Sequence, residues 1–370
     1  MSRLRLPWHR NIGPIGLDLG SPDPLAMQVR LGADTPVRAR VFPTFPEATL
    51  VDRAAAAAAG LRRGGFVGRE IVVGLPSSCT KMSVARLPVI SGRDGLESIA
   101  WEAAERSGQP RESLVADAIP TGAPSTSHEG KEEHLLVSTP VTELTQALDH
   151  LIDAGFEPIA VEPRFASIAR ALSRRNRRDA DVVDVRAVLH VEHASSLVMV
   201  LRGDRIAFCR EVPTGGHVLD RAVAARLSVP IESASQLRAQ RIAAARGHGE
   251  PVDPVTEEAA LAATRATLDS LAGEVALCLR YFGVTFRGGQ PGRVVLSGPH
   301  GAEPRLAGII EETCRSSVVQ CEDEVPPTTE AASAPLEPVA PAKRGEIADW
   351  LACYGLSCRS RSLITLEDAA

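Results

Sequence analysis

The sequence predicts an α/β fold made of two similar halves, and three features of the chain support this. Strand-like and helix-like segments alternate along the 370 residues, which is typical of α/β proteins. The chain exceeds the roughly 250–300 residues at which a single hydrophobic core stops growing, so we expect two cores. Two hairpin-like segments, near residues 12–31 and 186–212, each open one half. Their repetition is the main evidence for a duplicated fold.

The first half opens with the hairpin-like segment at residues 12–31, in which apolar runs flank a turn at residues 18–21 that contains Gly, Ser and Asp. An Ala-rich helix is predicted over residues 49–63, because Ala is the strongest helix former, and it ends at Gly64. The short apolar run at residues 70–76 predicts a buried strand.

Shorter segments complete both halves. In the first half the patterns predict strands at 83–87 and 134–139, helices at 96–106 and 141–154, a loop at 120–130, and a segment at 158–162 that leads into a helix at 166–174. In the second half they predict paired strands at 186–201 and 204–212, a strand at 293–296, and helices at 218–227, 233–246, 256–281, 304–313 and 347–359.

Composition and charge argue against several classes of protein. The net charge of −5 gives no broad cationic face, so the sequence does not favour a nucleic-acid-binding protein. Arg3, Arg5 and Arg10 are not followed by the apolar segment of a signal peptide, and no run approaches the roughly 20 apolar residues of a spanning helix. The seven cysteines lack the spacing of a zinc site. We therefore expect a reduced, cytoplasmic protein whose cysteines do not form a metal site.

Several short segments occur in a fixed order along almost the whole chain. They include Ile15-Gly16-Leu17-Asp18-Leu19-Gly20-Ser21, the segments at 72–76 and 208–216, Val294-Val295-Leu296-Ser297-Gly298, and the closing segment at 352–359. This ordered set resembles the actin-like ATPase superfamily. It is most similar to the PilM family of type IV pilus assembly proteins, which are relatives of the division protein FtsA.

The resemblance implies a two-lobed actin-like fold, that is, a duplicated ribonuclease H-like fold, with an inserted α+β subdomain in the first lobe. The parts that it implies are a first lobe at 12–78 with 163–185 and 345–370, an inserted interaction subdomain at 79–162, and a second lobe at 186–321. Residues 322–344 are rich in Pro, Ala and Glu, and their composition predicts a flexible linker.

The resemblance also implies a site for ATP and Mg²⁺, in which a turn from each lobe meets the phosphates across a cleft. It assigns Asp18, Gly20 and Ser21 to the first turn, because Gly lets backbone N–H groups approach a phosphate and a carboxylate positions hydrated Mg²⁺. The other nucleotide-binding candidates are in the second half: Gly215, Gly216, Arg238 and Gly298. We assign no catalytic residue and no protein metal site.

This sequence departs from the family pattern at both turns. His190 stands where the second turn should have Asp, and Glu192 stands where it should have Gly. A carboxylate about 4 Å from a phosphate charge costs roughly 4 kcal/mol at an effective dielectric constant of 20. In the first turn, Pro22 and Pro24 cannot donate N–H groups, and Asp23 adds negative charge.

Two further departures affect the contacts to the nucleoside. Ser235 replaces the Glu expected near the ribose, and Pro299 replaces the second of two paired glycines. Because all four departures weaken a nucleotide site, we expect ATP and Mg²⁺ binding to be weak or lost. A hydrogen-bonded pair of His190 and Glu192 is favoured over a metal site, because two ligands do not make a zinc site.

The function that the resemblance implies is a cytoplasmic scaffold for type IV pilus assembly. It would bind the N-terminal tail of a PilN-like inner-membrane protein through residues 79–162 and reach the membrane only through that partner. Alternatives are an active ATPase whose nucleotide state controls assembly, a sugar or acyl-group kinase, and the cytoplasmic part of a type II secretion platform protein. A kinase would need a carboxylate at position 190, where His stands. The sequence does not decide whether the protein forms a homo-oligomer.

Overall fold

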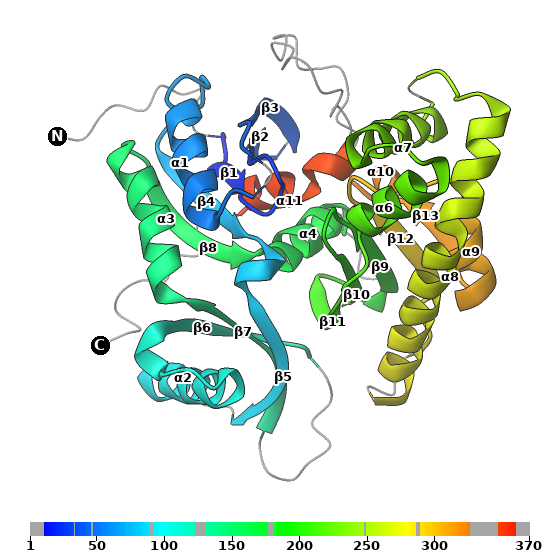
Figure 1. Cartoon of the computed structure of the whole chain (residues 1–370). Helices are drawn as coiled ribbons and strands as arrows, with labels where there is room; N and C mark the ends of the chain where they lie inside the picture. The colour runs from blue at the N-terminus through cyan, green and yellow to red at the C-terminus, as the bar shows by residue number, and fades with distance from the viewer. Residues whose placement is uncertain are drawn as a thin grey trace. The chain divides into compact units, whose positions relative to one another are not determined.

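A computed structural model of the chain describes residues 11–32, 34–45, 47–88, 92–122, 131–176, 181, 183–247, 249–285, 289–325 and 347–359. The chain divides into two compact units, residues 1–175 with 325–370 and residues 176–324. Their elements are labelled in Figure 1. Within the described parts of the chain, no helix combines the length and the apolar character needed to cross a bilayer.

The first unit is built on a five-stranded sheet with the order β3-β2-β1-β4-β8. The first three strands are antiparallel to their neighbours, and β1, β4 and β8 run parallel to one another. The strands of this sheet are β1 (Ile15–Asp18), β2 (Leu25–Arg30), β3 (Thr35–Val41), β4 (Glu70–Leu75) and β8 (Glu157–Pro163).

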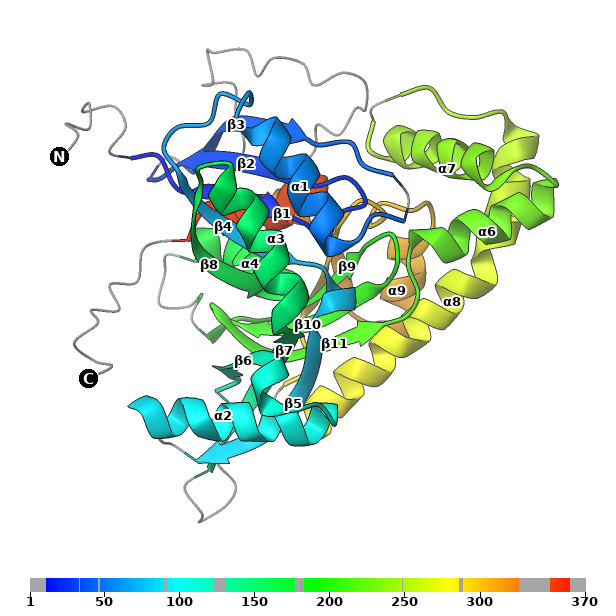
Figure 2. The same ribbon diagram turned by 60° about the vertical axis from the view of Figure 1, so that its left-hand side comes forward.

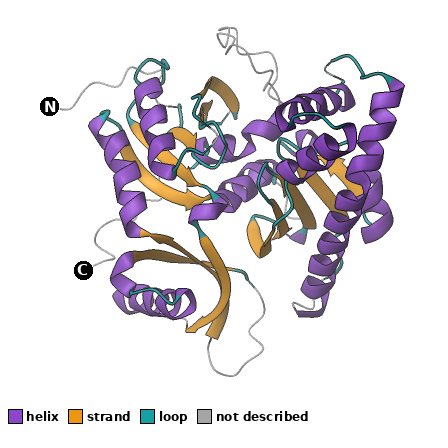
Figure 3. Ribbon diagram, in the orientation of Figure 1, coloured by secondary structure: helices purple, strands orange, loops and turns teal. Residues whose placement is uncertain are grey.

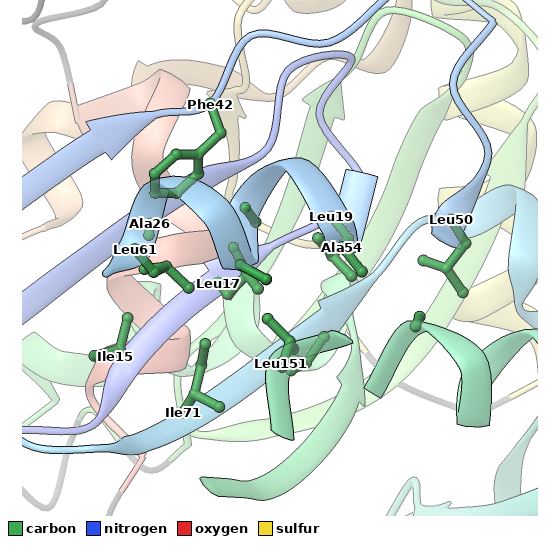
Figure 4. Packing of buried hydrophobic residues seen from close by; sticks show 14 of the residues in the cluster. Ile15, Leu17, Leu19, Ala26, Phe42, Leu50, Ala54, Leu61, Ile71 and Leu151 are labelled. Atoms are coloured by element: carbon green, nitrogen blue, oxygen red, sulfur yellow. The ribbon is translucent and has the colours of Figure 1, made fainter. Parts of the chain in front are cut away.

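Two pairs of helices cover the two faces of this sheet. On one face, α1 (Leu50–Leu61) and α3 (Val141–Asp153) lie side by side and bury an apolar cluster that includes Leu17, Ile71 and Leu151 (Figures 2 and 4). On the other face, α4 (Arg164–Leu172) packs against α11 (Ile347–Ser357), which also contacts β1. At Gly16 a Cβ would collide with the backbone carbonyl of Cys353, so α11 can approach this strand closely.

A second sheet is inserted in the first unit between β4 and α3. It has the order β5-β7-β6, and α2 (Gly92–Ser107) packs on one of its faces (Figure 3). Its strands are β5 (Lys81–Pro88), β6 (Leu114–Pro120) and β7 (Lys131–Pro140). The short helices η2 (Ser77–Cys79) and η3 (Arg111–Ser113) precede β5 and β6. The elements α3 and β8 fall within the predicted subdomain at 79–162, but they pack with the first sheet.

The second unit repeats the first sheet. Its strand order is β11-β10-β9-β12-β13, again with three antiparallel strands followed by two parallel ones. The strands are β9 (Val185–Val191), β10 (Ser196–Arg202), β11 (Arg205–Val212), β12 (Arg293–Ser297) and β13 (Ser317–Gln320). The identical topology confirms the predicted duplicated α/β fold.

The helices of the second unit differ from those of the first. The long helix α8 (Pro254–Thr285) contacts α6 (Gly216–Leu227) and α9 (Leu306–Cys314), and α7 (Ile231–Ala245) packs against α6 (Figure 2). The unit closes with α10 (Cys321–Glu324), where Glu324 forms an ion pair with Arg293.

The structure shows specific features at two of the predicted domain limits. Asp184, at the end of the predicted first lobe, pairs with Arg293 of the second unit at 2.8 Å. Residues 322–324 of the predicted linker at 322–344 belong to α10, and the rest of that linker after Val325 lies outside the described residues. The domain limits themselves stay a prediction.

Candidate functional site

The first turn follows β1, and its acidic residue lies at the carboxyl end of that strand. Because β1, β4 and β8 are parallel, their carboxyl ends meet at one edge of the sheet. Asp18 ends β1, and Arg164 begins α4 directly after β8. The topology therefore brings together an acidic and a basic residue that are far apart in the sequence.

Both oxygens of the Asp18 carboxylate have partners within the chain. The backbone N–H of Gly20 donates to Oδ1 at 2.9 Å, and the guanidinium of Arg164 lies 3.0 Å from Oδ2. The side chains of Asp18 and Arg164 are 1% and 6% exposed. A Cβ at Gly20 would collide with the side chain of Arg164, so this glycine makes room for the arginine.

Hydrogen bonds from other residues of the chain also fix the rest of the first turn. The backbone N–H of Thr44 donates to the Asp23 carboxylate at 2.9 Å, and the Thr44 hydroxyl donates to the Pro22 carbonyl at 2.7 Å. Arg53 donates to the carbonyl of Leu19 at 3.1 Å. Ser21 is buried. Asp23 thus acts as a local acceptor that fixes the turn.

The second turn joins β9 to β10, and His190 has the same place in its sheet as Asp18 has in the first. Asp18 pairs with Gly74 near the end of β4, and His190 pairs with Ser297 at the end of β12. His190 is buried; its Nδ1 lies 3.0 Å from the Ser297 hydroxyl, and its Nε2 lies 3.5 Å from Glu192 Oε1. An imidazole with these two neighbours replaces the expected carboxylate.

The start of α6 packs directly on the second turn. The N–H groups of Gly216 and His217 donate to the carbonyls of Glu192 and His193, at 2.8 and 2.9 Å. A Cβ at Gly215 would collide with the backbone of residues 193–195, so the close approach requires glycine. Free N–H groups at a helix start form an anion-binding site, but these N–H groups are bonded within the protein.

Arg238 lies at the centre of a buried ionic network in the second unit. Its guanidinium donates to the Gly216 carbonyl at 2.8 Å, to Asp220 at 2.6 Å and to Glu303 at 2.7 Å. Arg241 extends the network, since it bonds both Glu303 and Glu257. Burial lowers the pKa of Arg241, but the hydrogen bond with Glu257 and the charges of Glu303 and Glu257 raise it overall. The neighbouring carboxylates therefore hold Arg241 as a cation.

The loop after β12 packs against the end of β9 and the start of α6. Gly298 has a φ of +88°, and a Cβ there would collide with the Val191 carbonyl, so the loop requires glycine at this position. The N–H of His300 donates to the same carbonyl at 3.2 Å. The imidazole of His300 lies against the Cα of Gly216 and has its Nδ1 3.4 Å from Arg238.

The structure gathers the predicted site residues in two places. Asp18, Gly20 and Ser21 form the first turn, and Gly215, Gly216, Arg238 and Gly298 surround the second turn. Their binding of a nucleotide stays a prediction. Sequence reasoning missed the residues that contact them: Arg164 in the first unit, and Asp220, His300 and Glu303 in the second. Arg164 directly follows β8, but only the parallel order of β1, β4 and β8, which the sequence does not show, brings it beside Asp18.

Solved structures that are similar to this chain support the fold described above. A chain of the PilM–PilN type IV pilus biogenesis complex is similar to this chain over 95% of this chain and 100% of that one, with a TM-score of 0.72 and 19% identity. The chain has the PilM-type actin-like fold. The ethanolamine utilization protein EutJ from Carboxydothermus hydrogenoformans is also similar, with a TM-score of 0.51, 14% identity, and coverage of 96% of this chain and 91% of that one. No protein-family model and no curated protein matches the sequence.

The groups present at the two turns of this chain do not fit a Mg²⁺–nucleotide. At Asp18, a divalent cation about 4 Å from the Arg164 guanidinium would be repelled by about 8 kcal/mol at an effective dielectric constant of 20. In the second unit, the first N–H groups of α6 are bonded to backbone carbonyls, and Arg238 is bonded to two carboxylates. We therefore derive no chemical step through a nucleotide.

Proposed function

We propose that this protein is an actin-like assembly factor for the inner-membrane platform of a type IV pilus, or of a related type II secretion machine. In this role it binds the N-terminal cytoplasmic tail of a PilN-like membrane protein and has weak or absent ATPase activity. The supporting observation is the similarity to a chain of the PilM–PilN complex, which spans that whole chain and 95% of this one. The protein would work in the cytoplasm and reach the inner membrane through its partner.

The inserted sheet supplies a suitable surface for such a tail. The helix α2 covers the face that carries Ala85 and Leu136. Side chains alternate along strands, so Val84 and Leu135 lie on the opposite face, where Ile119 is their neighbour across β7. We call this row of three apolar side chains the insertion face; Val84 is 37% exposed, Ile119 is half-buried and Leu135 is buried.

The edge of the same sheet offers a second mode of contact. The strand β5 is an outer strand, since the order of the sheet is β5-β7-β6. An extended peptide can add to an outer strand through its backbone and place alternate side chains on one face of the sheet. A tail bound in this way would lie beside the insertion face. We therefore place tail binding at β5 and the insertion face, within residues 79–162.

A binding assay with matched variants tests the proposal. The probe is a peptide with the sequence of the N-terminal cytoplasmic tail of a PilN-like membrane protein, and affinity is measured by fluorescence anisotropy. Val84→Asp places a charge on the insertion face, and we expect it to weaken binding at least about tenfold, or about 1.4 kcal/mol.

The control is Trp101→Asp on α2, whose side chain is 64% exposed. It adds the same charge to the same subdomain, and we expect less than about a twofold change. Equal effects of the two variants would refute the proposed surface. Failure of the intact protein to bind any such tail would refute the proposed function.

A further inference from the structure

The long helix α8 of the second unit has an exposed face that carries large apolar side chains (Figure 2). The buried side of this helix packs in the second unit, where α8 contacts α6 and α9. Leu277, Tyr281 and Val284 are exposed, and their spacings of four and three residues place them on one side of the helix. Leu277 is 46% exposed and Val284 is 78% exposed. Grouped apolar side chains on a surface are typical of sites that bind another protein.

The preceding part of the same face carries small side chains. Ala262, Ala266, Ser270 and Gly273 are exposed there, and a Cβ at Gly273 would meet no atom within 4 Å. Large side chains pack well opposite small ones, because the two surfaces then interdigitate. Each half of the face is therefore shaped to receive the other half from a second copy of the chain, provided that the two α8 helices run antiparallel.

The spacing of these residues fits a two-fold axis that passes beside Gly273. In an antiparallel pair, residues at equal distances along the chain before and after the axis lie opposite each other. Ala262 and Val284 are both eleven residues from Gly273, so Val284 lies opposite Ala262 of the second copy. Leu277 follows Gly273 by four residues and Ser270 precedes it by three, so these two also meet. In both cases a large apolar side chain packs on a small residue.

Two charged residues on the same face favour the antiparallel pair over a parallel one. Asp269 and Arg280 are both exposed, and Arg265, 3.4 Å from Asp269, lies one helical turn before it on the surface. In the antiparallel pair Arg280 lies three residues, or roughly 4.5 Å along the axis, from Asp269 of the second copy, a distance that the arginine side chain can span. In a parallel pair each of these residues would instead meet its own counterpart. Charge complementarity therefore points to a second copy in the antiparallel orientation.

We infer that the exposed face of α8, residues 262–284, is a self-association surface on which two copies of this chain pair through antiparallel α8 helices. Both copies contribute the same residues, so the interface closes on itself and yields a dimer rather than a filament. The surface belongs to the second unit and shares no residue with the insertion face. The inference therefore goes beyond the proposed function and does not depend on it.

Sedimentation equilibrium of the full chain over a range of concentrations tests the inference. One pair of helices is a small interface, so we expect the wild type to form a weak dimer with a Kd of about 10–100 μM. Leu277→Asp places a charge within the face and should weaken the dimer at least about tenfold. The control is Ile231→Asp on α7, whose side chain is 42% exposed, and it should change the Kd less than about twofold.

Charge reversal tests the orientation of the pair. Asp269→Arg and Arg280→Asp each bring like charges together at both symmetric contacts of the antiparallel dimer, and each should weaken self-association about tenfold. A mixture of the two variants restores opposite charges at both contacts, so the mixed dimer should form within about threefold of the wild-type Kd. Both side chains are exposed, so these variants decide the question if Leu277→Asp does not fold.

Three outcomes would overturn the inference. A wild-type chain that stays monomeric at about 500 μM would assign the face to a different partner. Equal effects of Leu277→Asp and Ile231→Asp would place self-association elsewhere on the molecule. Single charge variants that dimerise as well as the wild type, with a mixture that associates more tightly than the wild type, would show that the helices pair in parallel.

Discussion

The two five-stranded sheets have the same topology, but their turns satisfy buried polar groups in different ways. In the first unit one ion pair, between Asp18 and Arg164, neutralises the turn. In the second unit the turn is closed by backbone hydrogen bonds from α6, and the neighbouring charges form a network centred on Arg238. The comparison shows that the same sheet topology can neutralise the charged groups beside its turn either with one ion pair or with a network of several.

The largest effect is expected at the network in the second unit. Arg238→Met would leave Asp220 and Glu303 without their shared partner in a buried setting. Removing one member of a buried ionic group typically costs about 3–5 kcal/mol, and we expect a value near the upper end for unfolding of the second unit in urea. The control is Arg226→Met on the exposed side of α6, which should change stability by less than about 0.5 kcal/mol.

This variant also tests the contrast between the units. Arg164→Gln leaves Asp18 without its cation, whereas Arg238→Met leaves Asp220 without its cation and Glu303 with Arg241 as its remaining partner. We therefore expect the loss in the second unit to be the larger one. Equal losses would show that the network around Arg238 has no greater stabilising role than the single ion pair.

A second prediction concerns the packing of α6 on its turn. Gly216→Ala would place a Cβ against the imidazole of His300, and we expect a loss of about 2 kcal/mol, which is typical of overpacking. Combining it with His300→Ala should recover at least about 1 kcal/mol of coupling energy, because the collision is then relieved. The measurement is a double-mutant cycle by chemical denaturation.

The control for this cycle is Gly273→Ala in α8, where an added Cβ meets no atom within 4 Å. It should stabilise the protein by about 0.5–1 kcal/mol, since Ala is a better helix former than Gly. An additive cycle for Gly216 and His300 would mean that the imidazole does not restrict the start of α6.

The smallest effect is expected at the buried histidine of the second turn. Ser297→Ala removes the hydroxyl that lies 3.0 Å from His190 Nδ1. The loss of one buried hydrogen bond should cost about 1 kcal/mol, measured by thermal or urea unfolding. The exposed Ser317→Ala serves as the control and should cost less than about 0.5 kcal/mol. If the two substitutions cost the same, Ser297 does not hold the imidazole.

The sequence predicted elements with strong patterns and missed those with weak ones. The hairpin strands β9 and β10 are mostly apolar, and α11 is almost entirely apolar, so all three were predicted. The strand β3 was missed because it is partly exposed along its whole length and contains Pro36. The strand β6 was also missed, because it contains Asp117 and ends in Pro120. The strand β13 was missed because it has only four residues.

The candidate site was predictable only where its residues are neighbours in the sequence. Asp18 and Gly20 form a local turn, and the two glycines at the start of α6 lie directly after a strand. Arg164 could not be placed beside Asp18 without knowing that β1, β4 and β8 are parallel neighbours, which tertiary structure determines. Arg238 was predicted from family resemblance as a nucleotide-binding candidate, but its carboxylate partners could not be foreseen because they come from two other segments.

The most direct measurement of the central claim is a calorimetric titration of the full wild-type chain with ATP in the presence of Mg²⁺. With both turns satisfied by the protein's own groups, we expect no binding at concentrations up to about 1 mM. Binding with a dissociation constant of about 10 μM or less that is lost in Asp18→Ala would contradict the account. It would show that the Asp18 carboxylate is available to a metal-bound nucleotide despite Arg164.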